Sequence, residues 1–315
     1  MAEWLYEAGI GEARAALVED GAIVEAAIEP EGTLPVGTVA RGRLAELLPR
    51  RQGRVVLADT QAEVLLAAVP PGITQGAAVT VEIVREAVAE PGRRKPARGV
   101  ASDRAPAPGP DLLARITATG LPVRRPRAHE ADALEAAGWS ELLEEARTGD
   151  IAFAGGVLRM SVTPAMTLFD VDGYLDPEPL ALAAAQAAAA AIRRHGIGGS
   201  IGIDFPTLAG KAPRQAVAAT LDAHLSPPFE RTTVNGFGFL QIVRPRPRPS
   251  LPERLRLDPL RAAATALLRS WEREPPGGPA VHALPAALVR FLEDRPAWLA
   301  ELARRSGVVH RLEPR

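Results

Sequence analysis

The chain of 315 residues is 47% apolar and 24% charged, which is ordinary for a globular protein and excludes a chain disordered throughout. Its net charge of −1 gives no overall attraction to a polyanion, and the absence of cysteine excludes disulfides and cysteine-ligated metal sites. It has no apolar run long enough to span a membrane, and its acidic start, MAEWLYE, differs from a signal peptide, so we expect a cytoplasmic protein with no membrane partner.

Short strands dominate the first part of the chain. In residues 1–35, the turn pair Asp20-Gly21 between two apolar runs predicts a hairpin. Residues 36–88 then alternate between short strand patterns and turns. Strands at this spacing predict a small barrel, with members expected at 37–44, 53–59, 62–66 and 77–84.

Proline and glycine break this pattern over 89–110, which predicts a linker. Residues 111–150 are mainly helical, most clearly over 130–147. After an alternating Arg-Pro run, the C-terminal part (251–315) begins with a predicted helix over 258–274.

The most informative segment lies within 151–250 and has the pattern strand, helix, strand. One apolar strand runs into Asp170, an alanine-rich helix follows, and a second apolar strand ends at Asp204. The strands of such a unit are parallel, with a right-handed crossover. We therefore expect the two aspartates side by side at the carboxyl edge of a sheet, where ligand sites lie.

Adjacent carboxylates repel each other unless a cation or a proton lies between them. Mg²⁺ suits such a site, because it prefers oxygen ligands and can activate a water for attack on a phosphodiester. The pattern alone leaves a second interpretation open, in which Asp170 and Asp204 are strand-end residues that bind no metal. By the same spacing, Asp172 is either a third ligand or a turn residue.

Four segments resemble, in the same order, motifs of the ribonuclease E/G family. The segments 162–173 (VTPAMTLFDVDG) and 198–205 (GGSIGIDF) resemble those that carry the family's two metal-binding aspartates. The glycine pair in 155–158 (GGVL) resembles the sequence before the site. The segment 236–246 (GFGFLQIVRPR) resembles the strand and arginine-rich exit that follow it.

The resemblance implies an α/β fold in which a nuclease core carries a ribonuclease H-like region and an inserted, degenerate OB-fold barrel. The implied parts are N-terminal strands packing on the ribonuclease H-like region (1–35), an OB-fold-like RNA-binding module (36–88), a linker (89–110), a helical ribonuclease H-like region (111–150), the catalytic core (151–250) and a small αβ tail (251–315).

The resemblance also implies an activity, the internal cleavage of single-stranded RNA in processing or decay, with Mg²⁺ or Mn²⁺ as cofactor. In this interpretation Asp170 and Asp204 hold the ion. Asp172 orients the attacking water, at a position where the family usually has Asn. The protein would form a homodimer, and its RNA contacts would come from the arginines Arg244, Arg246, Arg41 and Arg43.

Departures from the family pattern leave two other functions open. The barrel carries Leu57 and Leu65 where the family has base-stacking aromatics, and the region that recognises a 5′-phosphate is largely missing. Paired cysteines are absent, so no zinc-linked tetramer is expected. With Asp172, these changes favour an RNA-binding relative with little or no catalysis. The other alternative is an unrelated Mg²⁺-dependent α/β enzyme for a small phosphorylated substrate, against which the arginine clusters at 41–54 and 244–256 argue.

The histidines and tryptophans show no functional pattern. The spacing of the four tryptophans predicts separate core contacts. No metal-ligand spacing is found among the histidines His129, His195, His224, His282 and His310.

Overall fold

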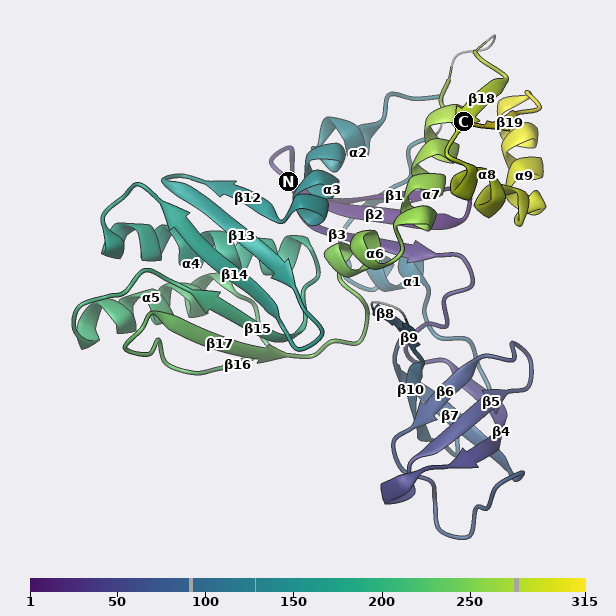
Figure 1. Ribbon diagram of the computed structural model, residues 1–315, viewed down its shortest axis with the longest axis horizontal. Coiled ribbons are helices and arrows are strands. Elements are labelled where there is room, and N and C mark those ends of the chain that lie inside the picture. The colour runs from purple at the N-terminus through teal and green to yellow at the C-terminus, as the bar shows by residue number, and fades with distance from the viewer. Residues whose placement is uncertain (91–92, 128, 275–277) are drawn as a thin grey trace.

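Figure 1 shows the computed structural model, in which a β-barrel projects from a body made of two sheets and their helices. The fold is mixed α/β, as the sequence predicts. Within the part of the chain that is described, no helix has both the length and the apolar character needed to cross a membrane. The structure describes residues 1–90, 93–127, 129–274 and 278–315.

The first sheet of the body has the strand order β11 (Val123–Arg124), β1 (Glu3–Ala8), β2 (Glu12–Glu19) and β3 (Ala22–Pro30). A tight turn with positive φ at both Asp20 and Gly21 joins β2 to β3, so the predicted hairpin is confirmed. One face of this sheet packs against α1 (Leu112–Thr117). The other packs against α2 (Ala133–Ala136), α3 (Trp139–Thr148) and α6 (Leu251–Leu257).

The helix predicted over 130–147 is two helices, α2 and α3. The chain turns between them at Gly138, where φ is 97°. Asp132 begins the first helix, because its side chain accepts hydrogen bonds from the backbone N–H groups of Leu134 and Glu135. Within the segment predicted as helical, residue 128 lies outside the described residues.

Five strands close into the barrel, in the order β10 (Ala97–Ala101), β6 (Glu63–Leu66), β5 (Gly53–Leu57), β4 (Val39–Leu47) and β7 (Ala78–Arg85). A 3-10 turn, η1 (Pro49–Arg51), joins β4 to β5. The core of the barrel is aliphatic throughout. The predicted barrel is therefore confirmed, but it extends beyond residue 88.

The linker predicted over 89–110 contributes the closing strand, so this prediction is wrong for β10. Proline and glycine made the segment resemble a linker. Its inward residues Ala97 and Gly99 are small, however, and this allows β10 to pack tightly between β6 and β7. The preceding residues form a short hairpin of β8 (Val88–Glu90) and β9 (Arg93–Lys95), and 91–92 lie outside the described residues.

The two chain segments that connect the barrel to the body are paired with each other. Val39 and Ala107 exchange two backbone hydrogen bonds of 2.9 Å. Next to them, the N–H of Gly109 donates to Oγ1 of Thr38 at 3.0 Å. The barrel is thus an insertion that enters and leaves through one narrow neck.

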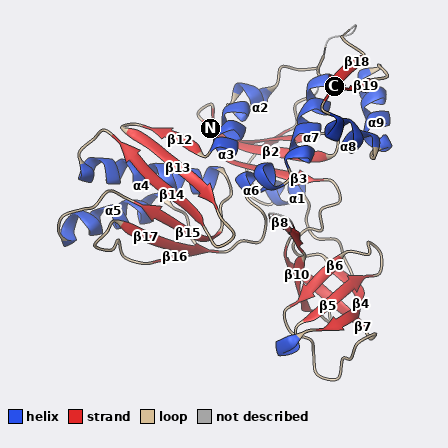
Figure 2. Ribbon diagram, viewed as in Figure 1, coloured by secondary structure: helices blue, strands red, loops and turns tan. Residues whose placement is uncertain are grey.

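The second sheet of the body has six strands, in the order β12 (Asp150–Phe153), β13 (Gly156–Val162), β14 (Thr167–Gly173), β15 (Gly199–Asp204), β17 (Phe239–Arg244) and β16 (Glu230–Arg231). Strands β14 and β15 are adjacent and parallel, as the sequence predicts, and the other pairs are antiparallel. Helices α4 (Pro177–Arg194) and α5 (Lys211–His224) cover one face, and the other face is open (Figure 2).

The C-terminal part packs against the far end of the first sheet. Helices α7 (Pro259–Glu272), α8 (Ala286–Glu293) and α9 (Pro296–Ser306) share a core with Ile10 of the β1–β2 connection. The parallel strands β18 (Val281–Leu284) and β19 (Arg311–Pro314) complete an αβ unit. The predicted helix at 258–274 is confirmed as α7, and residues 275–277 lie outside the described residues.

Candidate functional site

Asp170 and Asp204 lie side by side on β14 and β15. They are direct partners in the parallel register, which places their backbones about 4.8 Å apart. Their chain neighbours Phe169 and Ile203 are fully buried against α4 and α5. Because side chains alternate between the faces of a strand, both aspartates lie on the open face, at the edge that the sequence predicts.

The two carboxylates are exposed. In the part of the chain that the structure describes, neither forms a hydrogen bond or an ion pair. Two like charges in neighbouring positions repel each other, so a cation that binds both would relieve this repulsion. Two carboxylates with water in the remaining ligand positions form a donor set that fits a hard divalent ion such as Mg²⁺.

Asp172 lies two residues beyond Asp170, on the same face of β14, but it has a partner. Its carboxylate forms an ion pair of 2.7 Å with Nε of Arg159, which lies opposite Asp170 on β13. Among the described residues, no three Asp, Glu, His or Cys side chains are arranged to hold a metal ion. The structure thus pairs Asp172 with Arg159.

The register aligns five side chains in one row across the open face. From β12 to β17 they are Asp150, Arg159, Asp170, Asp204 and Phe239. The ring of Phe239 lies over β15, because a Cβ on Gly202 would come within 2.6 Å of it. A cation, two carboxylates and an aromatic ring are thus next to one another, a combination that the sequence analysis did not predict.

Further groups gather at the carboxyl edge above this row. Tyr174, which follows β14, and Phe237, which precedes β17, are each 84% exposed. Arg214 of α5 lies beside the second of these loops, since its Nη1 is 3.5 Å from where a Cβ of Gly236 would be. Lys211 begins α5 at the same edge and is exposed. A weak signal for this group was present in the sequence, where two phenylalanines alternate with glycine.

Arg244 and Arg246, predicted as RNA contacts, do not join the aspartates. Strand β17 runs antiparallel to β15, so Arg244 lies opposite Gly199, about 16 Å along the sheet from the level of Asp204. It points to the covered face, where burial lowers its pKa and the charge of Glu25 raises it. Arg246 is ion-paired with Glu253 of α6. Their positions indicate a structural role at the junction between the two parts of the body.

Arg41 and Arg43 are exposed on β4 of the barrel, as predicted. Arg43 donates a hydrogen bond of 2.6 Å to the carbonyl oxygen of Gly76, while Arg41 extends into solvent. Leu57, at a predicted stacking position, is in the barrel core, and Leu65 is half-buried. The barrel strands contain no aromatic residue at all.

Two of the histidines that are scattered in the sequence meet in the structure. Nε2 of His282 on β18 and Nδ1 of His310, which directly precedes β19, are 2.8 Å apart. Both rings stack on Trp271, with His282 at a centroid distance of 4.0 Å. Burial lowers the pKa of both histidines. The sequence did not predict this cluster, in which two histidines far apart in the chain share one tryptophan.

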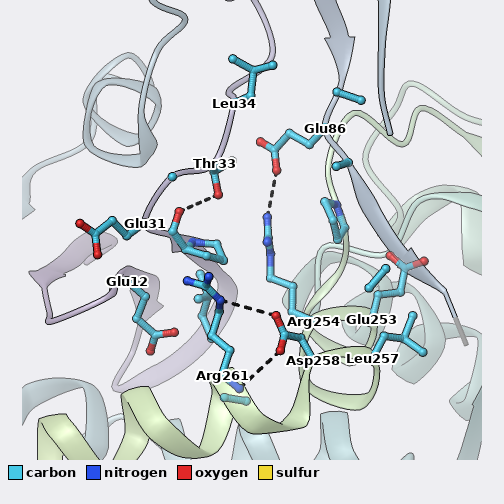
Figure 3. Close-up of a pocket in the computed structure, with 18 of the residues that line it drawn as sticks. Glu12, Glu31, Thr33, Leu34, Glu86, Glu253, Arg254, Leu257, Asp258 and Arg261 are labelled. Carbon is cyan, nitrogen blue, oxygen red and sulfur yellow. Dashed lines mark hydrogen bonds and ion pairs between the residues drawn. The ribbon is translucent and has the colours of Figure 1, made fainter. Parts of the chain in front are cut away.

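A cavity of about 790 Å³ lies between the barrel and the body, away from the carboxylates. Figure 3 shows Glu86, which follows β7, reaching Arg254 of α6 in this cavity. The ion pair is 3.0 Å long, and Arg248 approaches the other oxygen of Glu86 at 3.3 Å. None of the predicted site residues lines the cavity, in which the ion pair of Glu86 with Arg254 joins the barrel to α6.

Comparison with known protein families gave no match, and a search among curated proteins also gave none. The site is therefore interpreted from its own geometry and from the motifs in the sequence.

Proposed function

We propose that this chain is a Mg²⁺-dependent endoribonuclease of the ribonuclease E/G type, which cleaves single-stranded RNA internally. The observation that carries the proposal is the pair Asp170 and Asp204, in register on adjacent parallel strands and with no side-chain partner among the residues described. Both lie within segments that resemble the family's metal-binding motifs. The two carboxylates would hold Mg²⁺ or Mn²⁺.

A bound ion would activate a water molecule and stabilise the charge that develops on the phosphate. The chain's own groups would place the substrate. Arg159 is held on the open face by Asp172, directly opposite Asp170, so its guanidinium is available to a phosphate approaching the carboxylate pair. Asp172 would orient this cation, and an Asn at the same position could accept a hydrogen bond from the same Nε with its side-chain oxygen.

The finer fold assignments belong to the same proposal. The five-stranded barrel, in which the last strand, β10, pairs in parallel with the third, β6, would be the OB-fold-like module. The sheet β11-β1-β2-β3, with helices on both faces, would be the ribonuclease H-like region. The six-stranded sheet that carries Asp170 and Asp204 would be the nuclease core.

A binding function without catalysis is the second candidate. It is favoured by the ion pair between Asp172 and Arg159, because the carboxylate that would orient the attacking water is already bound to Arg159. Such a protein would retain the RNA-binding surface and would bind the same single strands without cutting them.

The deciding experiment is cleavage of an end-labelled, 5′-monophosphorylated single-stranded RNA with and without Mg²⁺. Asp204→Asn keeps the shape of the side chain but removes the charge that holds a hard cation, so we expect a loss of activity of about a hundredfold or more with folding intact. Asp170→Asn should behave in the same way. The double variant should be little worse than either, because both residues act on one ion.

Asp150→Asn is the matched control, since this exposed aspartate lies in the same row but two strands away from Asp170 and three from Asp204. It should cleave like the unmodified protein, and Asp172→Asn, which restores the usual family residue, should keep or raise activity. Binding without cleavage at any Mg²⁺ or Mn²⁺ concentration would establish the second candidate. Undiminished cleavage by Asp204→Asn would show that the assigned site is wrong.

A further inference from the structure

Phe237 differs from most aromatic residues of the chain in being held out in water. Its side chain is 84% exposed, although it lies only two residues from Phe239, whose ring packs on the open face of the sheet. Exposing a large ring contributes nothing to folding, because the apolar area it could bury remains in contact with water. A single exposed ring is not unusual, but Phe237 lies at the same edge as the equally exposed Tyr174 and beside the carboxylate pair, and grouped exposed aromatics mark interaction sites.

The loop that carries Phe237 is fixed by its own hydrogen bonds. Oδ1 of Asn235 accepts hydrogen bonds from the N–H groups of Phe237 and Phe239, at 2.9 and 3.0 Å. Gly238 has φ of 95°, and a Cβ there would be only 2.2 Å from the carbonyl oxygen of Phe205, so no other residue fits. The ring is therefore pre-positioned, which reduces the entropy lost when it binds a ligand.

The groups around this ring match the parts of a nucleotide. Phe239 lies opposite Asp204 in the register, so a second ring is directly beside the carboxylate pair. Arg214 lies against the Phe237 loop, within reach of an anion that passes along the edge. A base has a face that stacks on an aromatic ring, and its phosphate pairs with a guanidinium. The barrel strands contain no aromatic residue, so they cannot supply the stacking contact.

We infer that Phe237 and Phe239 form a base-stacking subsite beside Asp170 and Asp204, with Arg214 on the phosphate of the same strand. The identity of the ligand as single-stranded RNA rests on the proposed function. Because stacking needs unpaired bases, the subsite selects single strands over duplexes, and it does so without preference for one sequence. Recognition of bases is thus a property of the six-stranded sheet, and the barrel contributes phosphate contacts alone.

The test measures binding of fluorescein-labelled decamers by fluorescence anisotropy in EDTA, so that no divalent ion supports cleavage. The ligands are oligoadenylate and an abasic decamer with the same phosphates but without bases. Phe237→Ala should weaken the binding of oligoadenylate by about 5- to 100-fold, the effect of losing one stacked base. It should change the binding of the abasic chain by less than about twofold, since charge alone holds that ligand.

Val243→Ala is the control, because Val243 is exposed on the same face of β17 at its far end. It should bind both decamers like the unmodified protein. The inference is overturned if Phe237→Ala binds oligoadenylate within twofold of the unmodified protein. It is also overturned if this variant loses both ligands equally, or if the unmodified protein binds neither decamer.

Cleavage assays on the same proteins separate this inference from the proposed function. If Phe237→Ala weakens the binding of oligoadenylate but not of the abasic decamer, and the unmodified protein never cleaves RNA, the subsite is supported and the nuclease proposal is refuted. Cleavage that depends on Asp204, together with unchanged binding by Phe237→Ala, supports the nuclease and removes the subsite.

Discussion

Replacement of Arg14 by methionine should destabilise the body more than any exposed charge replacement. Arg14 on β2 is 1% exposed and forms ion pairs with Glu7 at 2.9 Å and with Asp132 at 2.7 Å. Its guanidinium also lies 5.1 Å from the centroid of the Trp139 ring. One buried cation thus connects the first sheet, the N-cap of α2 and helix α3.

The expected cost follows from these distances. A unit charge pair at 2.7 Å in an effective dielectric of 20 gains about 6 kcal/mol, and removing one partner of a buried pair typically costs about 3–5 kcal/mol. Arg273 remains beside both carboxylates after the replacement, at 2.6 Å from Glu7 and 3.4 Å from Asp132. We therefore expect a loss of about 3 kcal/mol in the free energy of unfolding, at the lower end of that range.

Arg193→Met is the matched control, because Arg193 also lies between two carboxylates of the first sheet. Its distances to Glu19 and Glu25 are 3.3 and 3.7 Å, and its side chain is 39% exposed. An exposed arrangement of this kind contributes less than about 1 kcal/mol. The assay is urea unfolding followed by tryptophan fluorescence, which reports on the body alone since the barrel strands contain no aromatic residue. The reasoning is refuted if the two variants differ by less than about 1 kcal/mol.

Two further predictions concern pH and salt. Burial lowers the pKa of the fully buried His195, although the hydrogen bond that its Nε2 donates to Glu145 opposes this shift, so the unfolded state binds a proton more readily. The free energy of unfolding should be constant above the unfolded pKa of about 6.5 and fall as pH drops below it. His195→Gln should reduce this slope in urea titrations between pH 8 and 5. Arg214→Ala should lower RNA affinity and reduce by about 0.7 the slope of the logarithm of the RNA association constant against the logarithm of salt concentration. Arg246→Ala should leave that slope unchanged and lower the melting temperature, because it removes the ion pair with Glu253.

The aspartate pair could be predicted because few topologies are compatible with that part of the chain. Strand, helix and strand in succession require parallel neighbours, so Asp170 and Asp204 had to meet at one edge. The closing strand of the barrel could not be predicted in the same way. Ala97 and Gly99 are poor strand formers by themselves, and only the tight space between β6 and β7 makes them suitable.

The placements that could not be predicted share one cause, the dependence on contacts between residues far apart in the sequence. Arg244 follows Phe239 by only five residues, but the antiparallel direction of β17 carries it to the opposite end of the sheet. His282 and His310 meet because β18 and β19 pair across two helices. Phe237 was missed because exposure depends on a loop conformation that local sequence does not determine.

The narrow neck of the barrel makes the chain modular. Val39 and Ala107 are hydrogen-bonded partners, so removing everything between them leaves a gap of about one strand spacing. A short glycine–serine linker can close that gap. This point in the chain therefore suits the removal or exchange of the inserted domain, either in evolution or by engineering. With a different barrel inserted at this point, the six-stranded sheet and its two aspartates would be combined with a different substrate-binding module.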